Sequence, residues 1–374
     1  MYKRFIILII IVFIMCLTNL TVFADGSYEG GSNITKIPVG ARAISMGYAF
    51  TAVADDGFAL FSNPAGIGNL SFMNVAIGYQ KQPFDQHIGA FAFSLPPMSE
   101  DSHFGIGIGG VGELINKGLE QRDATGTLST EKIKNQSYMG ILSLAYRISA
   151  IKGTKLGISL KYIREEIGDS KANAGSIDLG TIIPLPVIDI GAVIQDLALL
   201  NKYDDRDKMK FGNPTVKIGL ATNDDVPWGR ISVEMQKNIK TNDPVAFYVG
   251  GSFYLFKHVK QDTGLPSEIF DKLDMEKNKK ANKKSGVGEF GDDVEEFDDD
   301  FVEPEVKKVK DIDKKKVASE VVHHALLLNV GFKRDSFTGG ITYKFSFFSV
   351  DVATVFPSTF NKDFNMLGSV NLLF

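Results

Sequence analysis

Apolar and polar side chains alternate along most of this chain, in runs of about 8 to 14 residues. Within residues 153–164, one side of an extended strand would carry Leu156, Ile158, Leu160 and Tyr162, and the other Lys155, Gly157, Ser159 and Lys161. This period of two predicts β-strands, because successive side chains of an extended chain point to opposite faces. Fourteen such runs occur, at residues 71–80, 86–96, 102–111, 135–148, 153–164, 173–183, 187–196, 212–222, 229–237, 244–256, 319–333, 336–345, 348–356 and 362–374.

Two arrangements of these strands fit the alternation, a soluble β-sandwich and a barrel that crosses a membrane, since both give each strand one apolar and one polar face. An even number of strands whose connections alternate between short and longer favours the barrel. The short connections are 149–152, 184–186, 223–228 and 346–347, and the longer ones 112–134, 165–172 and 197–211. The predicted fold class is therefore all-β, a transmembrane antiparallel β-barrel of about 14 strands within residues 71–374.

The sequence finishes on an apolar strand whose last residue is aromatic. Val370, Leu372 and Phe374 share one face of this strand. Barrels of outer membranes end in this way, so these three residues are predicted to form the outer-membrane insertion signal read by the barrel assembly machinery. We expect the protein in the cell outer membrane, in contact with its lipid.

Residues 1–24 have the anatomy of a secretory signal peptide. Lys3 and Arg4 precede an apolar run at 5–17, and small or apolar residues lead to a cleavage site after Ala24. An uncleaved anchor is the alternative, although this run is shorter than the ~20 residues of a spanning helix. Cleavage would remove Cys16, the only cysteine, so disulfides would not stabilise the mature chain.

Residues 257–318 interrupt the series of strands with a charged insert on the side predicted to be periplasmic. Residues 271–318 hold 15 acidic and 12 basic residues among 48. Such a segment buries too little apolar surface to fold alone, so disorder is expected. A calcium site and a docking tail for a periplasmic partner are the alternatives, but the acids lack the spacing of a calcium-binding loop.

Composition excludes several other classes of protein. The 374 residues include 37 Gly and 28 Phe, and the net charge is −4. A nucleic-acid binder would be basic, and a disulfide scaffold would be rich in cysteine. No apolar run after the N-terminus is long enough for a polytopic helical membrane protein.

Residues 38–70, called the hatch below, are rich in small residues and turn signals. The turns are expected at Asp55-Asp56-Gly57 and at Asn63-Pro64-Ala65-Gly66. A barrel of this strand number has a lumen too wide for side chains of the wall to fill. Residues 25–70 are therefore predicted to be an N-terminal segment and a compact hatch that plugs the barrel.

The hatch motif resembles that of a known family. Its residues are Gly40, Arg42, Met46, Gly47, Asp55 and Asp56, followed by Asn63, Pro64, Ala65 and Gly66. They resemble the N-terminal hatch of the PorV/PorQ family and, more distantly, of the FadL-type long-chain fatty acid transporters. The strands from Gly339 to Phe374 are similar to the closing strands of the PorV/PorQ family. The resemblance implies a fourteen-stranded outer-membrane barrel with a lumenal hatch, and it does not extend to the charged insert.

Four glycines, Gly105, Gly107, Gly109 and Gly110, lie in the third predicted strand. FadL-type transporters have a kink in their third strand that opens a route into the bilayer, so the resemblance makes these glycines a candidate lateral opening. The alternative is that they make room for the hatch, since glycine within a strand often marks a close approach of backbones.

The sequence offers no catalytic constellation. Asp55 and Asp56 fit either a paired acid and base or a turn of the hatch, with Arg42 as the partner of one of them. His323 and His324 point to opposite faces of a strand and cannot share a metal. We therefore expect no enzyme activity, no cofactor and no metal site.

Charges on the inward faces of the strands are balanced, which argues against a strongly ion-selective pore. They are Lys155, Lys161, Lys217 and Lys344 against Asp178, Asp189, Glu234 and Asp351. Three functions remain: passive transport of hydrophobic, fatty-acid-like molecules, a PorV-like role in type IX secretion that receives or anchors cargo, and a structural role. Partners would be a hydrophobic ligand or secretion-system proteins, and no nucleic acid. The longest external connection, 112–134, is short for cargo binding, so transport is favoured.

Overall fold

The structure is a computed structural model. It describes residues 33–82, 85–98, 102–122, 128–148, 153–167, 170–197, 200–203, 210–211, 214–223, 226–241, 243–261, 320–333, 336–357 and 365–374. The predicted signal peptide at 1–24 lies outside the described residues, and so do residues 262–318 of the predicted insert. The predicted start of the insert at 257 is wrong, because residues 257–261 still belong to a strand. The chain divides into two units, residues 1–257 with 325–374, and residues 258–324.

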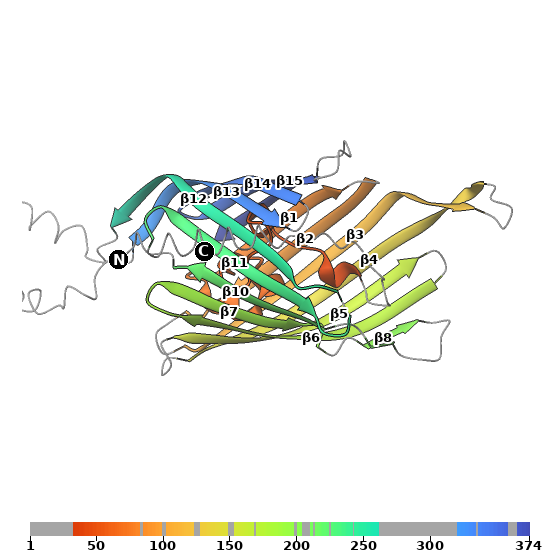
Figure 1. Cartoon of the computed structure of the whole chain (residues 1–374), viewed down its shortest axis with the longest axis horizontal. Helices are drawn as coiled ribbons and strands as arrows, with labels where there is room; N and C mark the ends of the chain where they lie inside the picture. The colour runs from red at the N-terminus through yellow and green to blue at the C-terminus, as the bar shows by residue number, and fades with distance from the viewer. Residues whose placement is uncertain are drawn as a thin grey trace, which may run out of the picture. The chain divides into compact units, whose positions relative to one another are not determined.

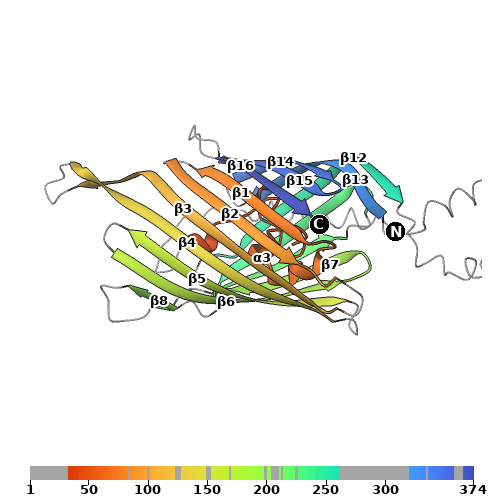
Figure 2. The same ribbon diagram turned by 180° about the vertical axis from the view of Figure 1, so that it is seen from behind.

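The described strands of the first unit form a closed, fourteen-stranded antiparallel β-barrel, which confirms the predicted fold class (Figures 1 and 2). The strands are β1 Asn74–Gln82, β2 Gln86–Leu95, β3 Phe104–Arg122, β4 Leu128–Ile148, β5 Thr154–Ile167, β6 Ser170–Pro184, β7 Ile188–Gln195, β10 Thr215–Thr222, β11 Gly229–Asn238, β12 Ala246–Gln261, β13 Glu320–Lys333, β14 Ser336–Phe345, β15 Phe348–Pro357 and β16 Asn365–Leu373. Each strand pairs with its neighbour in this order, and β1 pairs with β16 to close the wall.

One predicted connection, 112–134, is wrong because most of it is strand. β3 and β4 pair out to Arg122 and Leu128, whereas β2 pairs with β3 only as far as Ile115. β5 in turn pairs with β4 only from Asn135. The end of this hairpin therefore projects past both neighbouring strands (Figure 2). Its sequence has no continuous apolar face to signal a strand, but backbone hydrogen bonds alone can extend a hairpin.

A smaller difference lies in the predicted loop 197–211. The chain leaves β7 at Asp196, which has a positive φ of 58°, and then forms two short strands, β8 Leu200–Tyr203 and β9 Lys210–Phe211. β8 pairs with the start of β6 beyond the last residue that β7 covers. These strands are too short to carry an apolar period, so the sequence pattern does not predict them.

The wall is apolar outside and polar inside. On β5, Leu160 and Tyr162 are 53% and 59% exposed, whereas Ser159 and Lys161 are 0% and 5% exposed. The same inversion places Asp178, Glu234 and Asp351 among the buried residues of the lumen. A soluble sheet buries its apolar face, so this wall presents to its surroundings the face that a soluble protein hides.

Aromatic side chains gather at both ends of the barrel. We call the end that holds Asn74 and Leu373 the terminal rim, and the opposite end, where β1 leads into β2, the far rim. At the terminal rim the ring pairs include Phe104 with Tyr146, Trp228 with Phe253, and Phe345 with Phe348. Toward the far rim lie Tyr79, Tyr138, Tyr162, Phe337 and Phe356, all exposed. Two aromatic girdles around an apolar band are typical of barrels that cross a membrane.

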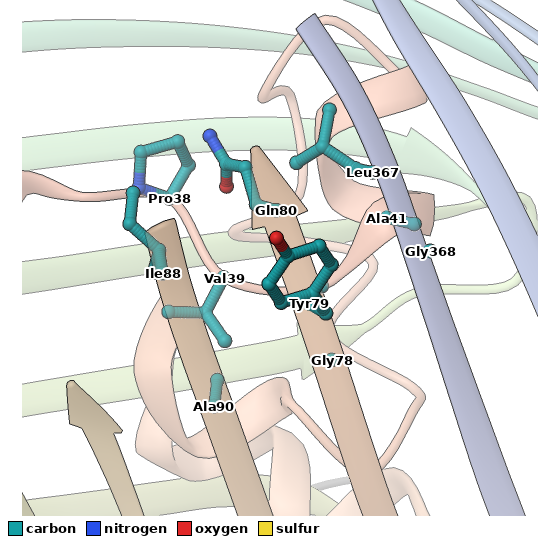
Figure 3. A pocket seen from close by; sticks show the side chains of 11 residues that line it. Pro38, Val39, Ala41, Gly78, Tyr79, Gln80, Ile88, Ala90, Leu367 and Gly368 are labelled. Atoms are coloured by element: carbon teal, nitrogen blue, oxygen red, sulfur yellow. The ribbon is translucent and has the colours of Figure 1, made fainter. Parts of the chain in front are cut away.

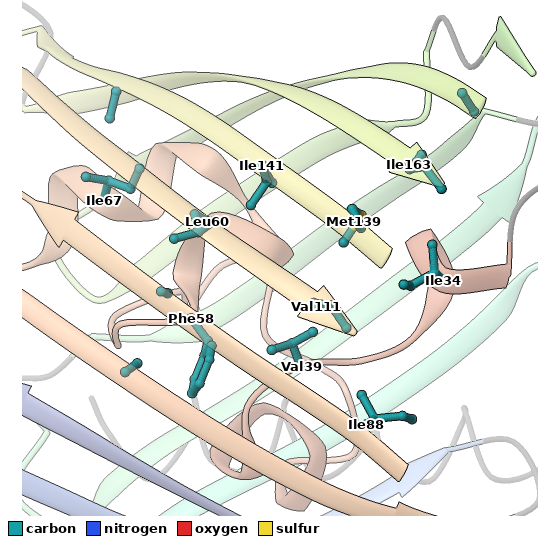
Figure 4. Close-up of a cluster of buried hydrophobic side chains, with 14 residues drawn as sticks. Ile34, Val39, Phe58, Leu60, Ile67, Ile88, Val111, Met139, Ile141 and Ile163 are labelled. Atoms are coloured by element: carbon teal, nitrogen blue, oxygen red, sulfur yellow. The ribbon is translucent and has the colours of Figure 1, made fainter. Parts of the chain in front are cut away.

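The hatch lies inside the barrel, where it is coloured red to orange among the strands (Figure 1). It consists of the short helices α2 Ala41–Ser45 and α3 Ala59–Ser62 and the 3₁₀ turn η2 Pro64–Asn69, and η1 Asn33–Lys36 precedes it. Among the described residues no helix has the length and apolar content needed to span a bilayer. Phe58, Leu60 and Ile67 of the hatch meet inward side chains of β1 to β6 in one buried cluster (Figure 4). Burying each side chain of this size stabilises the fold by about 1.5–3 kcal/mol.

The second unit, residues 258–324, is described only at its ends. There the rings of His258 and His324 stack with centroids 5.0 Å apart. The side chain of His323 lies outside the described residues, so the predicted opposite orientation of His323 and His324 stays a prediction.

Candidate functional site

Lumen-facing glycines seat the hatch directly on the wall. At six of them, on six different strands, a Cβ atom would lie under 3.0 Å from hatch atoms: Gly157, Gly180, Gly191, Gly250, Gly331 and Gly340. The hatch residues that they face are Ala65, Asn63, Ala52, Met46, Gly47 and Ser45, in the same order. Real Cβ atoms do not approach so closely, so each of these positions needs glycine. The hatch therefore rests against the wall along much of its length.

Residues of the predicted hatch motif shape this contact. Gly47 has a positive φ of 64° and lies against backbone atoms of Val249 and Phe332, so it needs glycine for both its conformation and its packing. Met46 is fully buried, and its carbonyl faces Gly250. Gly40, at φ 89°, precedes α2 and lies next to Phe58.

The second half of the motif is fixed by Asn63. This residue is fully buried, and its Oδ1 accepts the Ala65 N–H at 3.2 Å at the start of η2, where Pro64 lies in the first turn. Its Nδ2 donates to the carbonyls of Thr51 at 2.9 Å and Thr181 at 3.2 Å, which ties the hatch to itself and to β6. Gly66 packs against Ala54, with no room there for a side chain.

A buried network of ion pairs joins the hatch to β7 and β11. Arg42 contacts Asp55 within the hatch, and Asp55 Oδ2 also accepts from Arg230 Nη1 of β11 at 3.1 Å. Arg230 Nη2 donates to Asp189 Oδ2 of β7 at 2.8 Å. Burial opposes ionisation of Asp55, but the guanidinium groups of Arg42 and Arg230 outweigh it and hold the pKa of Asp55 well below its usual range. Asp55 is thus a charged anchor of the hatch.

The neighbouring Asp56 has a different environment. Its Oδ1 accepts the Phe58 N–H at 2.9 Å in a turn. Burial raises the pKa of Asp56 to about 7, and the charges of Asp55 and Asp351 add to the rise while Arg42 opposes it. The two carboxyl groups of the predicted pair therefore differ in protonation, with Asp55 ionised and Asp56 largely neutral below pH 7.

This difference predicts a pH dependence of stability. A carboxyl group whose folded pKa exceeds its unfolded value binds more protons when folded, so stability falls as pH rises from about 4 to about 7. Asp56→Asn keeps the acceptor for Phe58 and removes the charge. We expect the variant to match wild type near pH 4 and to exceed it by up to about 4 kcal/mol above pH 7. Denaturant unfolding in detergent across this range would measure the difference, and a gap that stays constant with pH would contradict it.

Two further anchors join the hatch region to the wall. Glu234 of β11 accepts the N–H groups of Phe50 and Thr51 at 3.1 and 2.9 Å. Within η1, the hydroxyl of Thr35 donates to Asp196 Oδ2 at 2.8 Å. Asp196 also forms an ion pair with Lys161, whose Nζ lies 2.6 Å from Asp178 Oδ2. Glu234 is thus satisfied by backbone N–H groups, and Lys161 is paired with two aspartates, which offsets the cost of burying these charges.

The glycines of β3 serve the hatch. β3 pairs without a register shift with β4 from Phe104 to Ile115 and with β2 from Ile106 to Ile115. A Cβ at Gly105 or Gly107 would lie 2.9 or 2.8 Å from Ile67. At Gly109 it would meet Phe61, and at Gly110, which faces outward, the ring of Phe91. These contacts agree with the alternative interpretation, in which the glycines make room for the hatch, and the lateral opening stays a prediction.

A small apolar recess remains between the hatch and the wall. Its lining on the hatch includes Pro38, Val39 and Ala41. On the wall it includes Ile88 of β2 and Leu367 of β16 (Figure 3). Its volume of about 20 Å³ is of the order of one water molecule. The hatch therefore leaves little open space on this apolar side of the lumen.

The described residues contain no group of three or more His, Cys, Asp or Glu placed to hold a metal ion. Asp55 is committed to two arginines, and Asp56 bonds to backbone. What the arrangement can do is hold a plug in a barrel through charges and close backbone contacts.

Sequence reasoning missed Arg230 and the glycines that seat the hatch. Arg230 shares the face of Ser232 and Glu234 on β11, so the period of two could have placed it in the lumen. Its partner Asp55 lies 175 residues away, and no local pattern connects the two. The six glycines are spread over six strands, and only the closed barrel brings them onto the hatch.

The predicted insertion signal lies on the outer face of β16. Val370, Leu372 and Phe374 are 40%, 37% and 62% exposed. The backbone of Phe374 exchanges hydrogen bonds with Met73 at 2.9 and 3.2 Å, so the chain's last residue completes the seam between β16 and β1. Its role as a signal stays a prediction.

Solved structures with this fold include two barrels for aromatic hydrocarbons. The toluene transporter TodX of P. putida aligns with a TM-score of 0.50 and 8% identity, covering 90% of this chain and 98% of TodX. The CymD monoaromatic hydrocarbon channel aligns with a TM-score of 0.52 and 10% identity, covering 90% and 97%. At such low identity these likenesses show the fold alone.

The sequence comparisons identify a family. A UPF0164 protein of Treponema pallidum (strain Nichols) is 25% identical over 260 residues, which cover 63% of this chain. The match spans 59% of that relative, so the chain covers about three-fifths of the relative's length. The PorV/PorQ resemblance stays a prediction. Residues 31–255 match the sequence model of an uncharacterised protein family, UPF0164, over more than half of the chain, and the chain therefore belongs to that family.

Proposed function

We propose that this protein is an outer-membrane barrel that lets small hydrophobic molecules pass when its hatch moves. The observation that carries the proposal is the inverted wall, with an apolar, aromatic-banded exterior and charges sealed in the lumen. An exterior of this kind is stable only in lipid. The fold shared with a toluene transporter and a monoaromatic hydrocarbon channel supports a hydrophobic cargo.

The lumen supplies a surface for such cargo. The inward faces of β1 to β6 carry a continuous group of apolar side chains that includes Ile88, Val111, Met139, Ile141 and Ile163 (Figure 4). In the described state Phe58, Leu60 and Ile67 of the hatch cover this surface. A molecule that displaces the hatch would exchange these apolar contacts for its own, so the cost of opening is offset by binding.

A reversible lock on the hatch tests the proposal. A Cβ at Gly219 of β10 would lie 3.4 Å from the Cβ of Ala52 in the hatch, close to the separation found in disulfides. Ala52→Cys with Gly219→Cys, in a Cys16→Ser background, would form the lock. The variants are placed in the outer membrane of a host that lacks its own fatty-acid uptake barrel, and uptake of a labelled long-chain fatty acid is measured.

We expect uptake above the empty host for wild type and for the reduced lock, and at least tenfold less for the oxidised lock. Each single cysteine variant is the control, because it cannot form the bond. Uptake equal to the empty host in all forms would contradict the conduit. Uptake that is high and unaffected by oxidation would show a route that bypasses the hatch. Fractionation of the same cells tests the outer-membrane location.

A secretion role of the PorV type is the second candidate, and the projecting β3–β4 hairpin favours it. The described residues 116–122 and 128–134 extend beyond both neighbouring strands and offer backbone contacts to a protein. Replacing 116–134 by a two-residue Asn-Gly turn would leave every barrel pairing of β2 and β5 in place. Loss of co-purifying secreted proteins from this variant, with fatty-acid uptake unchanged, would favour secretion over transport.

A further inference from the structure

A polar cavity of about 370 Å³ lies between the hatch and the wall at the terminal rim. It is separate from the apolar side of the lumen that the proposed conduit would use. Its lining includes Asp55 and Asn69 of the hatch, and Arg147, Lys155, Asp189 and Arg230 of the wall. Cavities of this volume are large enough for a small organic molecule.

The charges around this cavity do not cancel. Asp55 and Asp189 are matched by Arg42 and Arg230, which form ion pairs with them. Among the described residues, Lys155 and Arg147 have no acidic partner within 4.0 Å. Two positive charges therefore face the cavity without a matching negative charge.

Both side chains lie against the hatch at Gly68. Arg147 Nη2 donates to the Gly68 carbonyl at 2.7 Å, which fixes the guanidinium, while its buried Nε has no acceptor in the described structure. The stem of Lys155 packs against Gly68, where a Cβ would lie 2.8 Å from Lys155 Cγ. Both cationic groups are thus held beside the same hatch turn.

A neutral acceptor lies at the same cavity. Asn223 Nδ2 donates to the Leu185 carbonyl at 2.7 Å, which leaves its buried Oδ1 without a hydrogen-bond donor in the described structure. A ligand with a hydroxyl or amide N–H near its anionic group would satisfy this oxygen. The lining therefore combines cationic donors with one acceptor.

We propose that this cavity binds a small organic molecule with an oxyanion group, a carboxylate or a phosphate ester, held by Lys155 and Arg147. A planar guanidinium and an ammonium group together suit such an anion, and charge-assisted hydrogen bonds are the stronger kind. The site goes beyond the hydrophobic conduit and does not depend on it. Because Gly68 and Asn69 belong to the hatch, an anion bound here would also contact the plug.

The test uses the full chain in a non-ionic detergent and measures binding of 4-fluorobenzoate by ¹⁹F NMR. Lys155→Met removes the charge and keeps a long apolar stem against Gly68. Lys81→Met, at an exposed lysine of the far rim that pairs with Asp85, is the matched control. The neutral 4-fluorobenzyl alcohol reports any binding that depends only on the apolar ring. Acetate and inorganic phosphate serve as competitors.

We expect saturable binding of 4-fluorobenzoate that weakens at least tenfold in Lys155→Met and is unchanged in Lys81→Met. Stronger competition by phosphate than by acetate would assign the site to phosphate esters, and the reverse would assign it to carboxylates. Absence of binding, or equal affinity in Lys155→Met and wild type, would overturn the proposal. Failure of the conduit is distinguishable, because it would appear in fatty-acid uptake and leave this binding intact.

Discussion

Gly250→Ala is expected to unseat the hatch and open the barrel. The new Cβ would fall on the carbonyl of Met46, far inside van der Waals contact. A Cβ is fixed to its own backbone and the carbonyl is itself backbone, so neither atom can rotate away. Strand β12 cannot move away because it pairs with β11 residue for residue around this position. Overpacking of a core costs about 1–3 kcal/mol, and contacts with backbone lie at the upper end because no rotamer change relieves them.

Two measurements would detect the displaced hatch in Gly250→Ala. In planar bilayers we expect wild type to conduct ions poorly and Gly250→Ala to leak, since the plug of a wide lumen is displaced. Limited proteolysis of the detergent-solubilised protein should cut the hatch of the variant faster. Gly140→Ala is the control, because Gly140 lies on β4 with nothing within 4 Å of an added Cβ. Equal conductance and cleavage in the two variants would show that the glycines do not seat the hatch.

Arg230→Met should have the second large effect, through loss of the buried ion pairs. Arg230 is 5% exposed and links Asp55 of the hatch with Asp189 of β7. Removing one partner of a buried pair leaves an uncompensated charge and costs about 3–5 kcal/mol. Asp55 keeps Arg42, whereas Asp189 loses the arginine that joins it to the hatch. We expect a lower free energy of unfolding and faster cleavage of the hatch.

A second substitution separates charge from packing. Asp189→Asn added to Arg230→Met neutralises the carboxylate that has lost its ion pair with Arg230, so the double variant should recover part of the lost stability. Arg230→Lys keeps the charge but loses the planar guanidinium that donates to Asp55, Asp189 and the Thr222 carbonyl together. Its free energy of unfolding should therefore lie between those of wild type and Arg230→Met. If Arg230→Met unfolds with the free energy of wild type, the network does not hold the hatch.

Much of the wall could be predicted from sequence because each strand lies between two different environments. Alternation along residues 153–164 places alternate residues, among them Leu160 and Tyr162, outside and Ser159 and Lys161 inside, and the structure confirms this division. The alternation of apolar and polar residues is lost where both faces of a strand have the same surroundings. The end of the β3–β4 hairpin projects past its neighbours, so no apolar face marks it and the sequence predicts a loop.

The candidate site was predictable only in part. The hatch motif points to residues 38–70, and Arg42 and Asp55 lie only thirteen positions apart in the chain, so a pair between them was open to prediction. Arg230 carries the same charge as many lysines of the chain, and nothing local distinguishes it. The glycines of β3 invite two interpretations in the sequence, and only the position of Ile67 against Gly105 and Gly107 favours room for the hatch.

The sequence by itself therefore determined the strands, the face that each strand turns outward and the presence of a segment of small residues before the first strand. The tertiary structure decided which parts of the wall that segment touches, the link from Asp55 through Arg230 to Asp189, and the cationic cavity beside Lys155. The physical reason is the distance along the chain over which each feature acts. Alternation reports the two sides of one strand, whereas contacts across the lumen depend on the register and closure of all the strands together.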